Sequence, residues 1–331
     1  MVSKQRYVIY GAGAIGGVIG GCLHLAGFNV HLIARGAHLE ALQSHGLSLH
    51  RPGESWVLPI PASLSPSELS LTSDDVVILA MKSQHTMEAL EALGSAAPSD
   101  ITLVCAQNGV NNERLALRHF PNVYGMNVTM PATHLEPGVV IGEGTPVAGV
   151  LDIGRYPAGA DDLAHQIASD LRASNIDSQA HPDVMAYKYA KLRVNTGNAI
   201  DAVCGQGERQ TELAKQARAE ALAVYEAANI PVASPEQVQA RRGDFIMGEV
   251  DGHPRGGSSS WQSLARSAGS IEVDYLSGEI VLLGRLHGVP TPVNETALRL
   301  AKELARDKLP PASMPVDTVE AMVATARSAH Q

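Results

Sequence analysis

The first residues along this chain whose types and spacing indicate a chemical role are six near the N-terminus. Gly11-Ala12-Gly13-Ala14-Ile15-Gly16 matches the pattern GxGxxG and follows the apolar run 6–10. In such a loop the first glycine permits a tight turn, the second lets the backbone approach a pyrophosphate, and the third lets a helix pack on a strand. Since the loop stands between an expected strand and an expected helix, all six residues are predicted to bind a dinucleotide cofactor.

A cation stands at the end of the next expected strand. That end reads His31-Leu32-Ile33-Ala34-Arg35 and contains no Asp or Glu. NAD-selective loops usually have an acid here, which would repel a 2′-phosphate, whereas a guanidinium can form a charge-assisted fork with it. Arg35 therefore favours NADP, although a solvated strand-end cation is the alternative.

A third candidate group lies in residues 188–198. On one continuous helix Lys191, Asn195 and Asn198 occupy positions i, i+4 and i+7 and share a face. The two amides could hydrogen-bond a small anionic carbonyl compound, and the ammonium could donate a proton to it. An ordinary solvated helix face is the alternative, and the spacing alone does not choose between them.

The elements that would position these groups alternate between strand and helix. Continuous apolar runs, typical of parallel strands covered on both faces, alternate with helical segments at 86–93 and 112–120. The strands are expected at 6–10, 29–34, 76–81 and 101–105. This alternation predicts an α/β fold that begins with a Rossmann doubly wound sheet.

The pattern changes after His181-Pro182, where the periodicity from 183 to 329 becomes almost wholly helical. We therefore expect residues 1–181 to form an NADP-binding Rossmann domain and residues 182–331 a helical substrate and dimerisation domain. A homodimer is expected, although the sequence does not fix the oligomeric state. The polar stretch 234–260 is interpreted as a mobile loop or lid, or equally as a plain surface loop.

Composition excludes several classes of function. The 331 residues contain 25 Lys and Arg against 34 Asp and Glu, and this net charge of −9 argues against binding nucleic acid. The uncharged stretch 7–34 is interrupted by histidines and many glycines, so we reject a membrane span. Three cysteines without a CxxC pair predict no metal site and suit a reducing compartment. Without a secretory signal, the cytoplasm is expected.

Several further motifs occur in a fixed order along residues 7–300. Met81-Lys82-Ser83 and Gln107-Asn108-Gly109 follow expected strands, and Lys191 precedes Asn195. Ser259-Ser260 precedes the segment 271–279, and His287-Gly288-Val289-Pro290-Thr291-Pro292-Val293-Asn294 follows it. Together with the glycine loop, this set resembles the ketopantoate reductase family.

The resemblance implies an active site in a cleft between the two domains and NADPH-dependent reduction of 2-dehydropantoate to (R)-pantoate. Hydride delivery to a ketone carbon builds negative charge on oxygen, which a nearby ammonium can stabilise and protonate. The implied roles are a general acid, Lys191; a group near cofactor and substrate, Glu272; a contact to nicotinamide ribose and substrate, Asn108; substrate-binding residues, Asn195, Asn198 and Ser260; and a contact near the adenosine phosphate or ribose, Lys82.

The chain also departs from the family pattern. Asn198 follows Asn195 by three residues, where many relatives have four, and Trp261 places an indole beside Ser260. The neighbouring Ser258 and Ser259 leave the exact substrate-binding serine open. The alternatives are a reductase of another small 2-oxo acid on the same fold and a non-catalytic NADP(H)-sensing protein.

Overall fold

The computed structural model describes residues 5–253, 257–267 and 269–329, which divide into two compact units. The first unit runs to Lys188 and also includes the segment that begins at Pro235. The second contains Tyr189–Ser234 and the described residues from 257 onward. The predicted division at 181/182 differs from this one in two ways, because the first unit extends to Lys188 and also takes in the segment that begins at Pro235.

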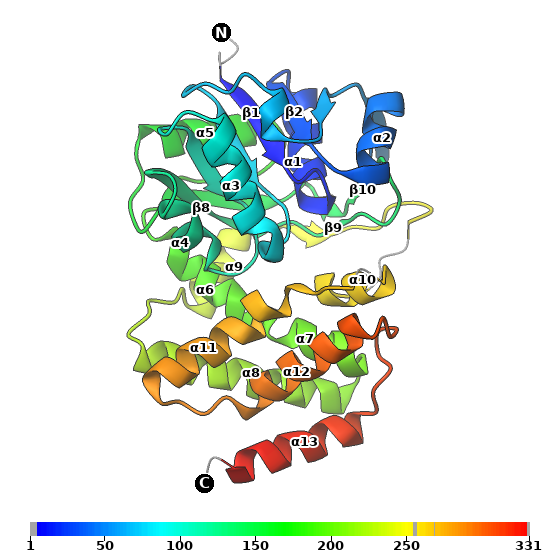
Figure 1. Cartoon of the computed structure of the whole chain (residues 1–331), viewed down its shortest axis with the longest axis vertical. Coiled ribbons are helices and arrows are strands. Elements are labelled where there is room, and N and C mark those ends of the chain that lie inside the picture. Colours follow the sequence, from blue (N-terminus) through cyan, green and yellow to red (C-terminus); the bar gives the residue numbers. More distant parts are fainter. Residues whose placement is uncertain (1–4, 254–256, 268, 330–331) are drawn as a thin grey trace. The chain divides into compact units, whose positions relative to one another are not determined.

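A seven-stranded sheet forms the centre of the first unit (Figure 1). Its order is β12-β8-β7-β6-β1-β2-β5, parallel throughout except that β12 runs antiparallel to β8. The strands are β1 Arg6–Tyr10, β2 Asn29–Ile33, β5 Ala62–Ser63, β6 Val76–Leu79, β7 Thr102–Cys105, β8 Asn122–Thr129 and β12 Val150–Arg155.

Both faces of this sheet carry helices, as expected for a doubly wound fold. Alternation along β1 directs Tyr7 and Ile9 into one apolar cluster and Val8 into another. The first cluster includes residues of α1 (Ala14–Leu25) and α5 (Asp162–Ala173), and the second includes residues of α3 (Thr86–Ala96) and α4 (Asn112–Leu117). The Rossmann prediction is confirmed.

A four-stranded sheet of order β4-β3-β10-β9 packs against α1. The strands are β3 Leu47–Arg51, β4 Glu54–Leu58, β9 Ala132–Thr133 and β10 Val139–Gly142. A Cβ on Gly17 would lie 2.6 Å from Val140, and one on Gly21 would lie 2.8 Å from Leu49. Gly17 and Gly21 therefore allow α1 to pack closely on this sheet. Among the described residues, no helix is long and apolar enough to cross a membrane.

Residues 235–253 are part of the first unit and contain regular structure. They form α9 (Pro235–Arg242) and β13 (Ile246–Met247), which pairs antiparallel with β11 (Gly144–Thr145). The interpretation of 234–260 as a loop or lid was therefore wrong for these residues. A short strand and a short polar helix have too few periodic apolar positions to stand out in the sequence.

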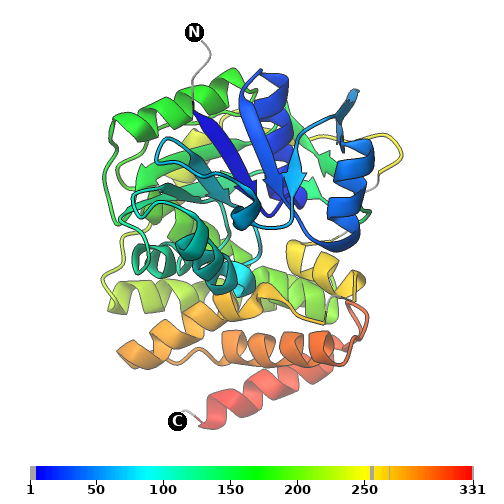
Figure 2. The same ribbon diagram turned by 45° about the horizontal axis from the view of Figure 1, so that its top comes forward.

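The second unit is helical, as predicted, around one apolar cluster. Successive helices α11 (Ser277–His287), α12 (Pro292–Arg306) and α13 (Val316–Ala329) pack side by side in this unit (Figure 2). Helix α6 (Val184–Asn195) spans the division between the units. The helices that follow it are α7 Gly197–Cys204, α8 Glu208–Ala227, α10 Ser259–Ala265, α11 Ser277–His287, α12 Pro292–Arg306 and α13 Val316–Ala329.

Candidate functional site

The glycine loop forms the turn between β1 and α1. Gly11 has φ +97°, and a Cβ there would lie 2.5 Å from the backbone nitrogen of Met81. A Cβ on Gly16 would lie 2.2 Å from the Gly11 carbonyl oxygen. At Gly13, by contrast, the nearest described atom beyond its own helix and chain neighbours would be His134 Cδ2, at 3.9 Å. The middle glycine therefore offers an open backbone surface, as a pyrophosphate cradle requires.

The sheet order places this turn at a topological switch point. Strand β1 lies between β2 and β6, and β7 follows β6. The carboxyl ends of β1, β6 and β7 therefore bring Gly11, Lys82 and Asn108 to the same edge of the sheet. Open α/β sheets bind ligands at such an edge.

A buried polar network joins the loops that carry Lys82 and Asn108. The Asn112 amide nitrogen donates to the Asn108 carbonyl oxygen at 2.9 Å and to Ser83 Oγ at 3.1 Å. Thr86 Oγ1 donates to the Asn112 amide oxygen and accepts from the Gln107 amide. Because Asn112 is fully buried, this network fixes the two loops relative to each other. The sequence analysis missed Asn112, since nothing in the local pattern distinguishes it from a surface amide.

Arg35 immediately precedes helix α2 (Gly36–His45) and is exposed. Its guanidinium lies 3.4 Å from the carboxylate of Glu88 in α3, and both side chains are more than half exposed. A pair this accessible is held weakly and leaves the guanidinium able to turn toward a phosphate. The Glu88 carboxylate was not foreseen, because it lies 53 residues away along the chain.

Lys191, Asn195 and Asn198 lie in the second unit, but not on one continuous helix. Helix α6 ends at Asn195, and α7 begins at Gly197. The Thr196 hydroxyl donates to the Arg193 carbonyl oxygen at 2.7 Å, where the two helices meet. Lys191 and Asn195 keep their i, i+4 relation, with Asn195 buried. Asn198 lies in α7, beyond an interruption at Thr196, where φ −58° and ψ −30° remain helical.

The serine cluster and Glu272 are also in the second unit. Ser258 caps α10, since its hydroxyl accepts from the Trp261 backbone N–H at 3.2 Å. The same Ser258 hydroxyl donates to the Asn198 carbonyl oxygen at 3.4 Å, so the serine cluster lies beside the segment that carries Asn198. Ser260 is buried in the first turn of α10, and Glu272 is buried at the start of a short 3-10 helix, Glu272–Tyr275. Ser258 is thus the N-cap residue of α10.

Comparison with known proteins assigns both units to one family. The family model described as ketopantoate reductase PanE/ApbA matches residues 7–157, and its C-terminal counterpart matches residues 183–305. The chain belongs to the ketopantoate reductase family. The 2-dehydropantoate 2-reductase of Archaeoglobus fulgidus is 31% identical, over 90% of this chain and 97% of that protein. The protein of the same name from Mesorhizobium japonicum is 27% identical, over 92% and 99%.

Solved structures agree with this ketopantoate reductase fold. A PanE/ApbA family ketopantoate reductase from Ralstonia eutropha is 27% identical, with a TM-score of 0.77 over 92% of this chain and 99% of that one. The ternary structure of D-mandelate dehydrogenase with NADH and anilino(oxo)acetate has a TM-score of 0.79 at 23% identity, over 92% and 99%. The second likeness concerns the fold alone.

Trp261 is a departure from the ketopantoate reductase pattern. A Cβ on Gly257 would lie 2.6 Å from Trp261 Cγ, so the indole packs against the Gly257 backbone. Any side chain at position 257 would have to displace the indole. The position of the Trp261 indole therefore depends on the absence of a side chain at Gly257.

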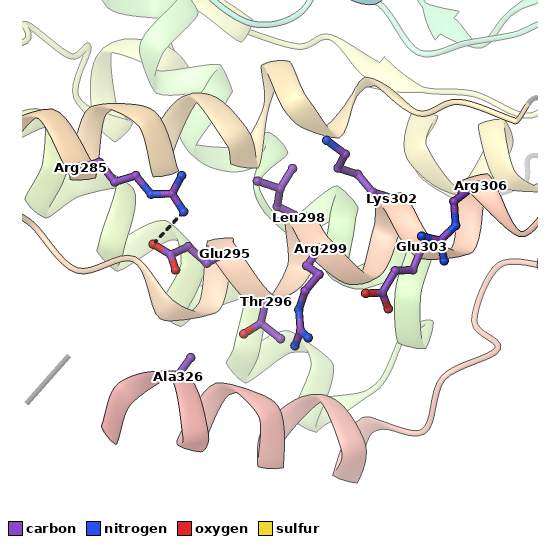
Figure 3. Close-up of a pocket in the computed structure, with 9 residues that line it drawn as sticks. All are labelled: Arg285, Glu295, Thr296, Leu298, Arg299, Lys302, Glu303, Arg306 and Ala326. Carbon is purple, nitrogen blue, oxygen red and sulfur yellow. Dashed lines mark ion pairs between the residues drawn. The ribbon is translucent and has the colours of Figure 1, made fainter. Parts of the chain in front are cut away.

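A cavity of about 640 Å³ lies in the second unit, and none of the predicted site residues lines it (Figure 3). It is lined by charged side chains of α11 and α12, among them Arg285, whose guanidinium lies 3.8 Å from Glu295. Its lining is Arg285, Glu295, Thr296, Leu298, Arg299, Lys302, Glu303, Arg306 and Ala326. Four of these side chains are cationic and two are anionic.

Proposed function

We propose that this chain is an NADPH-dependent reductase that converts 2-dehydropantoate to (R)-pantoate. The observation that carries the proposal is the open glycine turn at the switch point of the sheet, in a chain that matches both parts of the ketopantoate reductase family. When bound, the nicotinamide cofactor supplies the hydride that reduces the ketone carbon.

The residues of the first unit would bind the cofactor. The backbone of residues 11–16 would face the pyrophosphate, and Arg35 would pair with the 2′-phosphate. Lys82 would lie near the adenosine phosphate or ribose. The Asn108 side chain would contact the nicotinamide ribose and the substrate, on a backbone that Asn112 holds in place.

The residues of the second unit would bind the substrate and supply the proton. Lys191 would donate a proton to the oxygen that becomes negative during reduction, with its own proton replaced from water. Asn195, Asn198 and Ser260 would hold the hydroxyl and carboxylate of the substrate, and Glu272 would contact substrate and cofactor. A cytoplasmic homodimer completes the proposal.

Trp261 favours a second candidate, the reduction of a flatter or more apolar 2-oxo acid. An indole beside Ser260 would exclude a branched carbon if its ring faced the substrate. The chemistry and the roles of Arg35 and Lys191 would be the same.

A substrate panel scored by NADPH oxidation separates these outcomes. With 2-dehydropantoate, kcat/KM should be highest and above about 10⁴ M⁻¹s⁻¹, the lower end for a dedicated enzyme. A slow rate with 2-dehydropantoate and a fast rate with phenylglyoxylate would establish the second candidate. Tight NADPH binding without oxidation by any 2-oxo acid would leave a non-catalytic sensor.

A further inference from the structure

His38, in the first turn of α2, uses both nitrogens of its imidazole on backbone groups. Nε2 lies 2.7 Å from the Ala12 carbonyl oxygen, and Nδ1 lies 2.8 Å from the Gly138 backbone nitrogen. A carbonyl only accepts and a backbone N–H only donates, so the proton is on Nε2 and Nδ1 is unprotonated. His38 therefore makes these two contacts as a neutral ring.

The contact with Ala12 fixes the orientation of one peptide in the glycine turn. The Ala12 carbonyl and the Gly13 N–H belong to the same planar trans peptide and point in opposite directions. Holding the carbonyl on His38 thus directs the Gly13 N–H to the other side of the turn. That N–H belongs to the start of α1, where a pyrophosphate is expected.

The contact with Gly138 fixes the ring from the other side. The Gly138 carbonyl accepts from the Ser48 N–H at 2.8 Å, and a Cβ on Gly138 would lie 2.9 Å from Ala41 Cβ. Gly138 is therefore anchored to β3 through its carbonyl and lies against α2. The His134 ring also packs on His38, with centroids 4.3 Å apart, and its Nδ1 lies 2.9 Å from the Val139 carbonyl oxygen.

We propose that His38 is a positioning residue of the dinucleotide site, whose neutral ring, held in place by the Gly138 N–H, orients the Ala12–Gly13 peptide toward the pyrophosphate and loses that hold on protonation. This inference rests on the dinucleotide binding proposed above. A second ring proton would place an N–H on Nδ1 against the Gly138 N–H, and two facing donors repel.

The surroundings of His38 favour its neutral form. Burial lowers the pKa of the imidazole from 6.5, and the hydrogen bond to Ala12 opposes this only in part. His134 is the titratable group in contact with the ring, while Arg35, Glu40 and Glu136 on the adjoining elements are exposed. The contact with Gly138 is therefore complete above pH 6.5 and is lost as the pH falls through the lowered pKa, after which the ring is no longer held in place for Ala12.

Two substitutions separate the two contacts. His38→Gln keeps a donor near Nε2, for Ala12, whereas His38→Asn keeps an acceptor near Nδ1, for Gly138. The dissociation constant of NADPH, measured by fluorescence titration at pH 8, should rise about tenfold in His38→Asn and less than about threefold in His38→Gln. His45→Asn, at an exposed position of the same helix, is the matched control and should bind as the wild type does.

A pH series distinguishes positioning from a general packing role. The 2′-phosphate of NADPH titrates near pH 6, so affinities are compared between wild type and His38→Gln at each pH, where this contribution cancels. From pH 8 to 5.5 the wild type should lose about threefold or more relative to His38→Gln. A constant ratio, a relative gain by the wild type, or equal affinities of the Asn and Gln variants would overturn the inference. If wild type binds neither NADPH nor NADH, the proposed function fails instead.

Discussion

Lys188 Nζ lies 2.6 Å from Glu113 Oε1, and the two side chains are only 2% and 0% exposed. The same ammonium donates to the backbone carbonyls of Cys105, Gln107 and Met126 at 3.0–3.3 Å. One buried cation therefore ties the start of α6 to α4, to β8 and to the end of β7. Lys188 is committed to this structural role, although it lies only one helical turn before Lys191.

Removing this cation should destabilise the protein strongly. Lys188→Met leaves the Glu113 carboxylate buried without its partner and should lower the free energy of unfolding by about 3 to 5 kcal/mol in urea titrations. Lys215→Met, at an exposed pair with Glu212, is the control and should cost less than about 1 kcal/mol. Adding Glu113→Gln to Lys188→Met should recover part of the loss. Equal costs at positions 188 and 215 would contradict this account.

Arg241 should anchor the segment 235–253 to the first unit. Its guanidinium pairs with Asp152 and Asp177, each at 2.6 Å, and the Asp152 side chain is 1% exposed. Arg241→Ala leaves a buried carboxylate unpaired and should cost about 3 kcal/mol at pH 7, measured by urea unfolding. Arg242→Ala, at an exposed position of the same helix, should cost less than about 1 kcal/mol.

The cost of Arg241→Ala should also depend on pH. Burial raises the pKa of Asp152 above 3.8, and Arg241 opposes that rise in the wild type. Without Arg241 the pKa rises further, so the folded variant retains a proton that the unfolded chain has lost. Its stability deficit should therefore be small at pH 4 and widen toward pH 7. A deficit that is constant over this range would show that the carboxylate is not the cause.

Local patterns in the sequence predicted four strands of the Rossmann sheet, β1, β2, β6 and β7, because each of these buried parallel strands is a continuous apolar run. Residues 6–10, for example, form β1 with the expected bounds. The turn of the glycine loop was equally readable, since its geometry depends on residues that are adjacent in the chain. Both features are encoded within short windows of sequence.

The side-chain contacts that support the site could not be predicted in this way. His38 meets Gly138 a hundred residues away, and Lys188 meets Cys105 across 83 residues. A lone histidine or lysine in a helical pattern gives no indication of such a partner. The break at Thr196 was missed for another reason, because the residues on both sides of it are helical and the periodicity continues.

Arg35 should determine the preference for NADPH over NADH. Arg35→Ala removes a charge-assisted contact with the 2′-phosphate. The fall in kcat/KM for NADPH should correspond to a loss of about 1.5 to 3 kcal/mol of transition-state stabilisation, while kcat/KM for NADH changes little. Glu88→Gln removes the carboxylate that lies 3.4 Å from Arg35 and should raise the NADPH to NADH ratio. Equal sensitivity of both cofactors to Arg35→Ala would contradict the assignment.

Lys191 should act in the chemical step and not in cofactor binding. Lys191→Ala should bind NADPH as the wild type does in fluorescence titrations yet turn over at least about a hundredfold more slowly, the usual scale for loss of a general acid. Lys191→Arg keeps the charge but not the readily released proton, so it should remain slow. Lys215→Ala, at an exposed position, controls for the loss of a cation. Lys188 cannot replace Lys191, because its ammonium is enclosed by Glu113 and three backbone carbonyls. Near-normal turnover of Lys191→Ala would therefore assign the proton to water.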